Sequence, residues 1–509
     1  MRCIYFLIIL CLYSQCTSTE NRESNSDPQI TEIIKGEKGA ILDSLLSPYL
    51  IALREKTMND AGLAIGVSQG DQVIYAKAFG FADKSRGIKT DLNTQFHIAS
   101  LTKPLTAYAT LKLSESNRLN LTDSIGKYIP ELIDAGSNFA HVNIEQILTH
   151  TSGIPRHISV DDWQNSIISE DALDLNIEQL LEHELEFEPG TKYDYSNAAF
   201  DILGLVLSRA TGQTYFDLMD KEVLQPLGME HSTFLMPEDT LPINWANSHA
   251  FGLKTQVLQP FPYNLKVAPS SSLKASILDM CKWGMLHAGN GVLNNERKIN
   301  EAIFREMISP QYETPWGDHI GYSWYLQEYL ERPIIMHTGE SHGFESMLYI
   351  YPEEKISICV LANRSESRTG RIINATSEIL FGEKPKDYET SAIYSYSRVY
   401  ENEGRAKANA HWAELKEDTL DSYYTYDYSL LTSGSILENG GQWNQAQDLL
   451  KYYLIENKNS TYAWRLLGNC ELALADTTEA IRCFQKTLEI NPNYEKGKLA
   501  LKRLEKKMK

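Results

Sequence analysis

The sequence lacks the features that would bind a polyanion, a metal ion or a nucleotide. It has 509 residues and a formal net charge of −19, and its basic block is the C-terminal stretch KRLEKKMK. Nucleic acids and anionic membrane surfaces need a positive face on their partner, so neither is expected as a partner. No HExxH pair, phosphate-binding glycine loop or Gly-x-Gly-x-x-Gly pattern occurs, so no metal and no cofactor is implied.

Cysteines are few and are not spaced for a zinc site or a disulfide scaffold. The chain has seven, without a Cys-x-x-Cys pair outside the N-terminal segment. The three in that segment are Cys3, Cys11 and Cys16. Cys281 and Cys359 lie inside apolar runs, which indicates inert buried thiols. The disulfide status of Cys470 and Cys483 stays open.

The apolar run at the N-terminus, IYFLIILCLY, is too short to cross a membrane, which needs about twenty apolar residues. It follows Arg2 and precedes small residues, so residues 1–16 are predicted to be a secretory signal peptide. The protein is therefore expected to be exported, to the periplasm or the extracellular space. Cys16 leaves open a lipid anchor of the bacterial lipoprotein type. The polar residues 17–30 are predicted to be a tether.

The length indicates two or three domains. A helix is expected near 38–57, followed by a β-hairpin around QGDQ in AGLAIGVSQGDQVIYAKAFGFAD. Helical patterns dominate from about 101 to 210, and three strands are predicted within 333–362. Strands at both ends with helices between them predict an α/β domain over 31–385, in which N-terminal and C-terminal strands pair in one sheet.

A repeat follows this domain. Gly434 recurs as Gly468 at the period of tetratricopeptide repeats, with small residues where two helices touch and large ones in the groove. The residues of the second copy that match this pattern are Trp464, Leu467, Gly468, Ala480, Phe484 and Pro492. Clear repeats are predicted at 427–460 and 461–494, within an all-α module over 391–509. Because about three repeats are needed for a continuous core, a degenerate helix pair at 391–419 or the first domain is expected to supply the missing face.

Ser-x-x-Lys tetrads are candidates for nucleophilic catalysis, but the spacing alone identifies no nucleophile. The chain has three of them, Ser100/Lys103, Ser124/Lys127 and Ser271/Lys274. Only Ser100 begins a helical period that brings serine and lysine to one face, where unpaired N–H groups can hold an oxyanion. The other two tetrads are better explained as a turn and a helix cap. GVSQG, residues 66–70, matches a hydrolase nucleophile elbow, but a strand follows it, which predicts a hairpin.

Two later segments carry further candidates. Tyr195 and Asn197 precede an apolar-periodic helix that ends at Gly212, so a phenol and an amide can point into one cleft. His337-Thr338-Gly339 lies on a predicted strand that ends in glycine. Taken alone, the first segment is better explained by a helix cap with a half-buried tyrosine. The second is equally explained by a histidine at a strand edge.

Together, Ser-x-x-Lys, Tyr-x-Asn and His-Thr-Gly in this order resemble the serine β-lactamase and penicillin-binding-protein superfamily. The similarity is greatest to its class C β-lactamase and DD-peptidase branch. LTHTSGIP (148–155) and GYSW (321–324) add to the resemblance, which covers about residues 45–380. It implies an α/β fold in which an antiparallel sheet is flanked by helices, with a helical subdomain across the cleft.

The resemblance also implies catalytic roles for the matching residues. Ser100 would be the acylated nucleophile, and Lys103 and Tyr195 would share proton transfer. Asn197 would bind the substrate amide. The backbone N–H groups of Ser100 and Glu340 would form the oxyanion hole.

At the His-Thr-Gly segment, the resemblance implies that His337 and Thr338 bind or polarise one end of the substrate from an edge strand that ends at Gly339. Many β-lactamases have lysine in place of His337, and histidine is mostly neutral at pH 7 because its unperturbed pKa is about 6.5. Efficient lactam hydrolysis is therefore less expected. If the imidazolium binds a carboxylate, acylation by charged substrates should rise as the pH falls through about 6.5.

These patterns predict an exported serine hydrolase that forms an acyl-enzyme on Ser100. Its small-molecule or peptide substrate would be a D-amino-acid peptide, an ester or a β-lactam. The repeats suggest a protein partner. The alternative is a non-catalytic sensor or scaffold that acts through the repeats, although the intact motif residues weigh against it.

Overall fold

The computed structural model describes residues 30–159, 166–169, 171–235, 242, 244–258, 261, 263–417 and 423–508. The predicted signal peptide, all but the last residue of the predicted tether, and the predicted lipid anchor at Cys16 lie outside the described residues. Within them, no helix combines the length and the apolar character that crossing a membrane requires.

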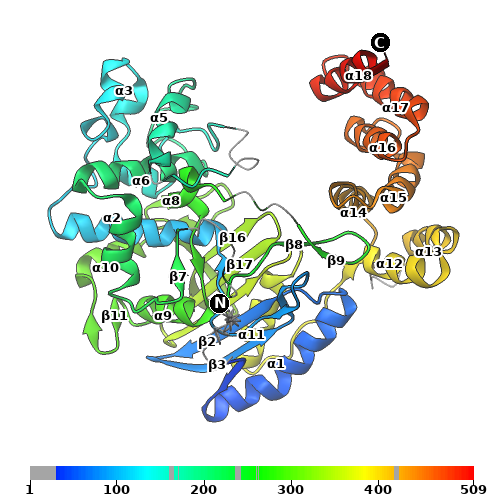
Figure 1. Cartoon of the computed structure of the whole chain (residues 1–509). Helices are drawn as coiled ribbons and strands as arrows, with labels where there is room; N and C mark the ends of the chain where they lie inside the picture. Colours follow the sequence, from blue (N-terminus) through cyan, green and yellow to red (C-terminus); the bar gives the residue numbers. More distant parts are fainter. Residues whose placement is uncertain are drawn as a thin grey trace, which may run out of the picture.

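Nine strands of the described chain form one antiparallel sheet (Figure 1). In spatial order they are β1 (Glu32–Ile34), β3 (Gln72–Phe79), β2 (Leu63–Gln69), β18 (Ile356–Ala362), β17 (Phe344–Tyr351), β16 (Arg332–Ser341), β15 (Tyr325–Tyr329), β14 (His319–Ile320) and β13 (Tyr312–Glu313). The pairing of β2 with β18 joins the two ends of the domain, with Gly66 opposite Cys359. This confirms the predicted fold class and the pairing of N-terminal with C-terminal strands.

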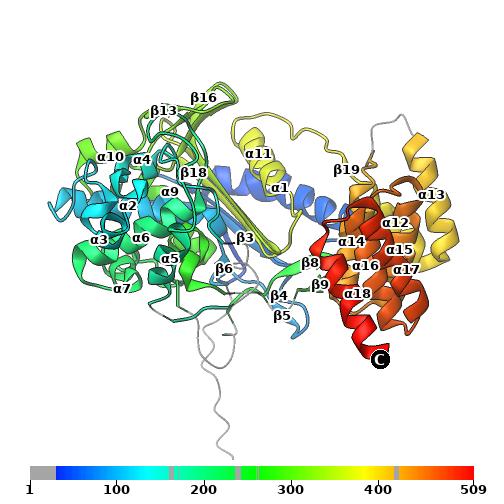
Figure 2. The same ribbon diagram turned by 90° about the horizontal axis from the view of Figure 1, so that it is seen from above.

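Helices cover both faces of this sheet (Figure 2). On one face, α1 (Gly36–Lys56) and α11 (Thr369–Leu380) pack on an apolar core. On the other, α9 (Ile277–Ala288) packs against β2 and β18, with α2 (Lys103–Glu115) and α6 (Asn197–Thr211) in the same larger core. A Cβ atom on Gly66 would lie 2.4 Å from the Cys281 sulfur, so only glycine lets α9 lie so near the sheet.

The remaining helices of this part of the chain are short: α3 (Pro130–Asp134), α4 (Ile144–Leu148), α5 (Leu175–Leu180), α7 (Tyr215–Met219), α8 (Ala268–Ser271) and α10 (Glu301–Met307). Its short strands are β4 (Phe81–Asp83), β5 (Ile88–Lys89), β6 (Phe96–His97), β7 (Ser232–Thr233), β8 (His249–Phe251), β9 (Thr255–Val257), β10 (Lys274–Ala275), β11 (Val292–Leu293) and β12 (Glu296–Arg297). Most of the short helices lie in the subdomain across from the sheet (Figure 1).

After the short strand β19 (Thr390–Ser391), a curved row of helices completes the chain (Figure 1). The row consists of α12 (Ala392–Glu403), α13 (Arg405–Glu417), α14 (Tyr428–Asn439), α15 (Trp443–Glu456), α16 (Thr461–Ala473), α17 (Thr477–Ile490) and α18 (Glu495–Met508), and the strand β20 (Tyr423–Tyr424) precedes α14. A Cβ atom on Gly468 would lie 2.7 Å from the Phe484 ring, which explains why the repeat has glycine there. Cys470 and Cys483 are buried free thiols.

The helical row shares its core with the first domain. Phe251 and Leu253, from the β8–β9 hairpin, lie in the same apolar cluster as residues of α12 to α17. The buried guanidinium of Arg364 donates hydrogen bonds to the Thr57 carbonyl, at 3.1 Å, and to the Tyr394 hydroxyl on α12, at 3.0 Å. Both α12/α13 and the first domain therefore contribute the apolar surface that two repeats alone would lack.

From this shared core we expect residues 427–509, expressed alone, to unfold without a cooperative transition. The fragment loses the contacts of Leu430 and Leu431 with the hairpin and with α12, so too little apolar surface is buried to offset the loss of chain entropy. Thermal melts followed by circular dichroism test this, with the full chain as the control. A sharp transition of the fragment at high temperature would contradict the prediction.

Candidate active site

Ser100 lies on a short 3₁₀ helix, Ala99–Thr102, that continues directly into α2. The Lys103 ammonium nitrogen is 3.2 Å from the Ser100 hydroxyl and donates a second hydrogen bond, at 2.9 Å, to the Ser270 carbonyl. Ala99 has a φ angle of 49°, in the left-handed region that residues with a side chain rarely adopt. Strain of this kind is typical of functional sites, where the surrounding structure holds it. The predicted pairing of Ser100 with Lys103 is thus present.

Lys103 is buried, with none of its surface exposed. Burial lowers its pKa to about 7, and the nearby Arg156 adds to the shift, while the Asp201 carboxylate opposes it. A lysine with such a pKa is partly unprotonated at neutral pH. It can therefore accept the proton of a neighbouring hydroxyl.

Tyr195 and Asn197 meet this pair from the start of α6. The N-cap residue Ser196 accepts a hydrogen bond from the backbone N–H of Ala199, which fixes the first turn of the helix. The Lys103 nitrogen lies 4.8 Å from the centre of the Tyr195 ring. Burial raises the pKa of Tyr195, and a hydrogen bond with Ser100 acts in the opposite direction. Tyr195 is thus a neutral phenol next to Ser100 and Lys103.

The side chain of Asn197 has a buried acceptor that no described group satisfies. Its amide oxygen is buried and has no hydrogen-bond partner among the described residues. Asn197 lines the same hollow as Ser100. A buried polar atom without a partner is costly, so a ligand donor that binds there gains from satisfying it.

His150 belongs to this group, although the sequence showed it only as part of LTHTSGIP. Its buried ring stacks on Tyr195 with 4.3 Å between ring centres. Its Nδ1 atom accepts a hydrogen bond of 3.2 Å from the Ser196 backbone N–H. Burial lowers the pKa of His150 well below its usual value, so the ring is neutral and carries its proton on Nε2. His150 therefore positions the Tyr195 segment.

The strand β16 passes close to Ser100. Its pairing with β15 ends at Met336 opposite Tyr325, so within the described chain residues 337–341 pair with β17 alone. A Cβ atom on Gly339 would lie 2.1 Å from the Ile98 carbonyl oxygen, which explains the glycine at this point. This close approach brings the backbone of Glu340 next to the start of the nucleophile helix.

His337 differs from the expectation of a carboxylate-binding imidazolium. Its side chain is 1% exposed and does not line the hollow of Ser100. Its Nδ1 atom lies 2.7 Å from the Thr338 carbonyl oxygen. Burial and the nearby Lys103 lower the pKa of His337 to about 3. The ring is therefore neutral from pH 5 to pH 8, and the predicted rise in acylation through pH 6.5 loses its physical basis.

Thr338 also differs from expectation. Side chains alternate along a strand, and the exposed Thr338 lies on the opposite face of the sheet from His337 and Gly339. It lines a separate hollow of about 540 Å³ near the start of α11. The structure therefore does not bring the Thr338 side chain to Ser100. Alternation along the strand was predictable, but which of its residues face the nucleophile was not.

The hollow in front of Ser100 has a volume of about 450 Å³. Its lining comprises Ser100, Arg156, His157, Asn197, Ser271, Glu340, Ser341, His342 and Ser365. Arg156 is exposed, and its guanidinium lies 5.0 Å from the centre of the Tyr195 ring. No sequence motif indicated Arg156, which supplies a positive charge beside the nucleophile, as a substrate carboxylate would require.

The competing serines have structural roles. Ser68 is buried within β2 and shares a 2.5 Å hydrogen bond with Ser357, which confirms the hairpin and excludes a nucleophile elbow. Ser124 precedes a 3₁₀ turn, as predicted. Ser271 is not a helix cap: it ends α8 and donates to the Val267 carbonyl, whereas the N-cap of α9 is Ser276.

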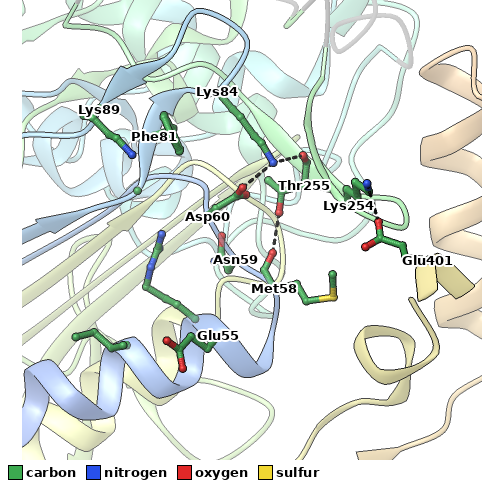
Figure 3. Close-up of a pocket in the computed structure, with 13 residues that line it drawn as sticks. Glu55, Met58, Asn59, Asp60, Phe81, Lys84, Lys89, Lys254, Thr255 and Glu401 are labelled. Carbon is green, nitrogen blue, oxygen red and sulfur yellow. Dashed lines mark hydrogen bonds and ion pairs between the residues drawn. The ribbon is translucent and has the colours of Figure 1, made fainter. Parts of the chain in front are cut away.

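A larger hollow, of about 560 Å³, lies elsewhere, at the end of α1 beside β4 and the β8–β9 hairpin (Figure 3). Lys84 points toward Asp60 and forms an ion pair of 2.6 Å with it (Figure 3). Lys254 forms a second ion pair, of 3.0 Å, with Glu401 of α12. None of the predicted site residues lines this hollow, and its Lys254–Glu401 ion pair joins the first domain to the helical row.

Two parts of the chain match known protein families. Residues 51–382 match the family described as Beta-lactamase, and residues 461–494 match the Tetratricopeptide repeat. The chain is 26% identical over 343 residues to Protein flp of Staphylococcus aureus (strain MW2), and the match spans 66% of each protein, just under two thirds. It is 25% identical over 363 residues to Penicillin-binding protein 4* of Bacillus subtilis (strain 168), which covers 65% of this chain and 76% of that protein.

Solved structures share the fold. A penicillin-binding protein homologue from Pyrococcus abyssi has a TM-score of 0.55 at 23% identity, with 70% of this chain and 80% of that chain covered. A beta-lactamase/D-alanine carboxypeptidase from Yersinia pestis also has a TM-score of 0.55 at 23% identity, with 68% and 98% covered. These likenesses show a common architecture for the first domain.

Proposed function

The chain belongs to the beta-lactamase family of serine hydrolases, and on this premise we propose that it is an exported enzyme that forms an acyl-enzyme on Ser100. One observation carries the proposal. The Ser100 hydroxyl lies 3.2 Å from the nitrogen of Lys103, a buried lysine whose pKa is lowered to about 7. A serine needs such a base to attack a carbonyl carbon at neutral pH.

In the proposed reaction, the Ser100 oxygen bonds to the carbonyl carbon of an amide or ester. The Ser100 proton passes to Lys103 and is delivered, through Tyr195, to the leaving nitrogen or oxygen as its bond to the carbon breaks. Water then adds to the acyl carbon, which releases the acid and returns a proton to Ser100. The backbone N–H groups of Ser100 and Glu340 would hold the carbonyl oxygen in both steps.

The substrate class follows from the charges around the hollow. Arg156, rather than His337, is the group that would bind a substrate carboxylate, because the guanidinium is exposed and stays charged at any physiological pH. The relatives named as penicillin-binding proteins and D-alanine carboxypeptidase support a D-amino-acid peptide, and β-lactams and esters are the alternatives. Lys103 and Tyr195 beside Ser100 weigh against a non-catalytic sensor.

The proposed export and the proposed protein partner of the repeats are supported by the sequence alone. The predicted signal peptide, residues 1–16, supports export to the periplasm or the outside of the cell, with a lipid anchor at Cys16 as the alternative. The tetratricopeptide repeats support a protein partner.

A substrate panel, followed by mass spectrometry of the intact protein and of its proteolytic peptides, tests the proposed function. The panel contains a peptide that ends in two D-alanines, a p-nitrophenyl ester and a penicillin. Each accepted substrate should add its acyl mass to the peptide that contains Ser100, and the adduct should disappear with turnover. Adducts that never turn over, for all three classes, would contradict the enzyme and support the sensor.

A further inference from the structure

A second cavity adjoins the hollow in front of Ser100, and α14 of the repeat module forms part of its wall. Its volume is about 200 Å³. The two spaces share His342, at the tip of the β16–β17 hairpin, and Ser365, which follows β18, in their walls. The hairpin tip is held there by a hydrogen bond of 3.0 Å from the Gly343 backbone N–H to the Ser365 hydroxyl. A group bound at Ser100 can therefore extend past this tip toward α14.

Direct contacts seat α14 on the first domain around this cavity. The Ser433 hydroxyl donates to the Phe251 carbonyl at 3.4 Å, and the Gln256 amide donates to the Ile436 carbonyl at 3.2 Å. A Cβ atom on Gly252 would lie 2.8 Å from a methyl carbon of Leu437, so the β8–β9 hairpin touches the helix (Figure 2). The wall is thus built from two parts of the chain that are packed together.

The lining is mainly apolar, with hydroxyl groups from α14 and one from the first domain. The apolar residues are Ala250, Phe251, Leu258, Ile393 and Ile436, and the hydroxyls belong to Ser365, Ser429, Thr432 and Ser433. Glu366 contributes a carboxylate, which disfavours an anionic ligand. At roughly 30 Å³ for each water-sized group, the volume accommodates about six or seven non-hydrogen atoms. An uncharged aliphatic chain of this size fits the cavity.

We propose that this cavity is a subsite for the acyl group of the substrate, and that α14 sets the length of acyl chain that the enzyme prefers. The inference rests on the proposed acylation of Ser100. The leaving group must lie beside its proton donors, Lys103 and Tyr195, and neither of these lines the cavity. The acyl group therefore extends to the other side of Ser100, toward His342 and α14. The repeat module would then contribute to substrate specificity as well as to partner binding.

The test measures kcat/KM of the full chain for p-nitrophenyl esters with acyl chains from acetate to laurate. Thr432→Trp fills the cavity from the α14 side and should lower the ratio of long-chain to acetate kcat/KM by about tenfold or more, because several methylene groups lose their apolar surroundings. Leu258→Ala enlarges the cavity from the opposite wall and should shift the preferred chain length upward. Asn439→Trp, exposed at the end of the same helix, is the matched control and should leave the profile unchanged.

Thr432→Trp should shift the preference toward short acyl chains and Leu258→Ala toward long ones, so a folding defect cannot produce both results. If Thr432→Trp fails to fold, the shift of Leu258→Ala toward longer acyl chains still tests whether the cavity is the acyl subsite. An unchanged chain-length profile in both variants would overturn the subsite while leaving the acyl-enzyme mechanism in place. Absence of any acyl adduct in the unmodified protein would instead contradict the proposed function itself.

Discussion

Replacing Ser100 by alanine should abolish covalent labelling by a fluorophosphonate or a penicillin probe, and should lower kcat/KM by about 10⁴-fold or more. The variant keeps Lys103, Tyr195 and the backbone donors but has no oxygen that can bond to the carbonyl carbon. Loss of a nucleophile typically leaves only the rate enhancement from binding and oxyanion stabilisation. Gel labelling and hydrolysis of the best substrate in the panel measure the two effects.

Three further serine-to-alanine variants provide controls. Ser68 and Ser124 have structural environments, so their variants should keep the label. Ser271 is the sharpest control, because it lines the same hollow as Ser100 but donates its hydroxyl hydrogen to the Val267 carbonyl. Labelling that survives Ser100→Ala and disappears in another variant would assign the nucleophile to that residue instead.

Features encoded by local patterns were predictable from the sequence. The helix before Gly212 ends at that residue with a φ angle of 68°, as its position after an apolar period predicts. The glycine of the second repeat, Gly468, packs against Phe484 as the repeat pattern requires. The Ser100–Lys103 contact is of the same kind, since a spacing of three residues within one helical turn determines it.

The features that depended on distant parts of the chain were not predictable. Arg156 directly follows LTHTSGIP and His342 lies two residues after Glu340, but neither belongs to a motif, and only the fold shows that both line the hollow. The resemblance implies that His337 binds the substrate from an edge strand, but burial lowers the pKa of its ring and keeps it neutral. The contribution of Phe251 to the core of the repeat module depends on a hairpin far from the repeats in sequence. Period-two alternation gives two faces of a strand, but only tertiary packing decides which face is at the site.

The pH dependence of acylation should reflect the deprotonation of the Lys103 amine. Since only the neutral amine accepts a proton, kcat/KM should rise about tenfold per pH unit below pH 7 and level off above about 7, the pKa of the buried lysine. With an ordinary lysine, this rising limb of the pH profile would lie more than three pH units higher. His337 and His150, which also face Lys103, have lowered pKa values and stay neutral over this range. Neutral esters and carboxylate-bearing peptides should therefore give parallel profiles between pH 5 and pH 8.

Two variants should move this limb in opposite directions. The Asp201 carboxylate favours the protonated amine, so Asp201→Asn should shift the limb to lower pH. The Arg156 guanidinium disfavours it, so Arg156→Gln should shift the limb to higher pH. His337→Gln should leave the limb where it is, because a ring that is already neutral contributes no charge to lose. The measurement is kcat/KM for a neutral p-nitrophenyl ester across pH 5 to 9. A limb that moves with His337→Gln and is unaffected by the other two variants would assign the ionisation to the histidine and remove Lys103 as the base.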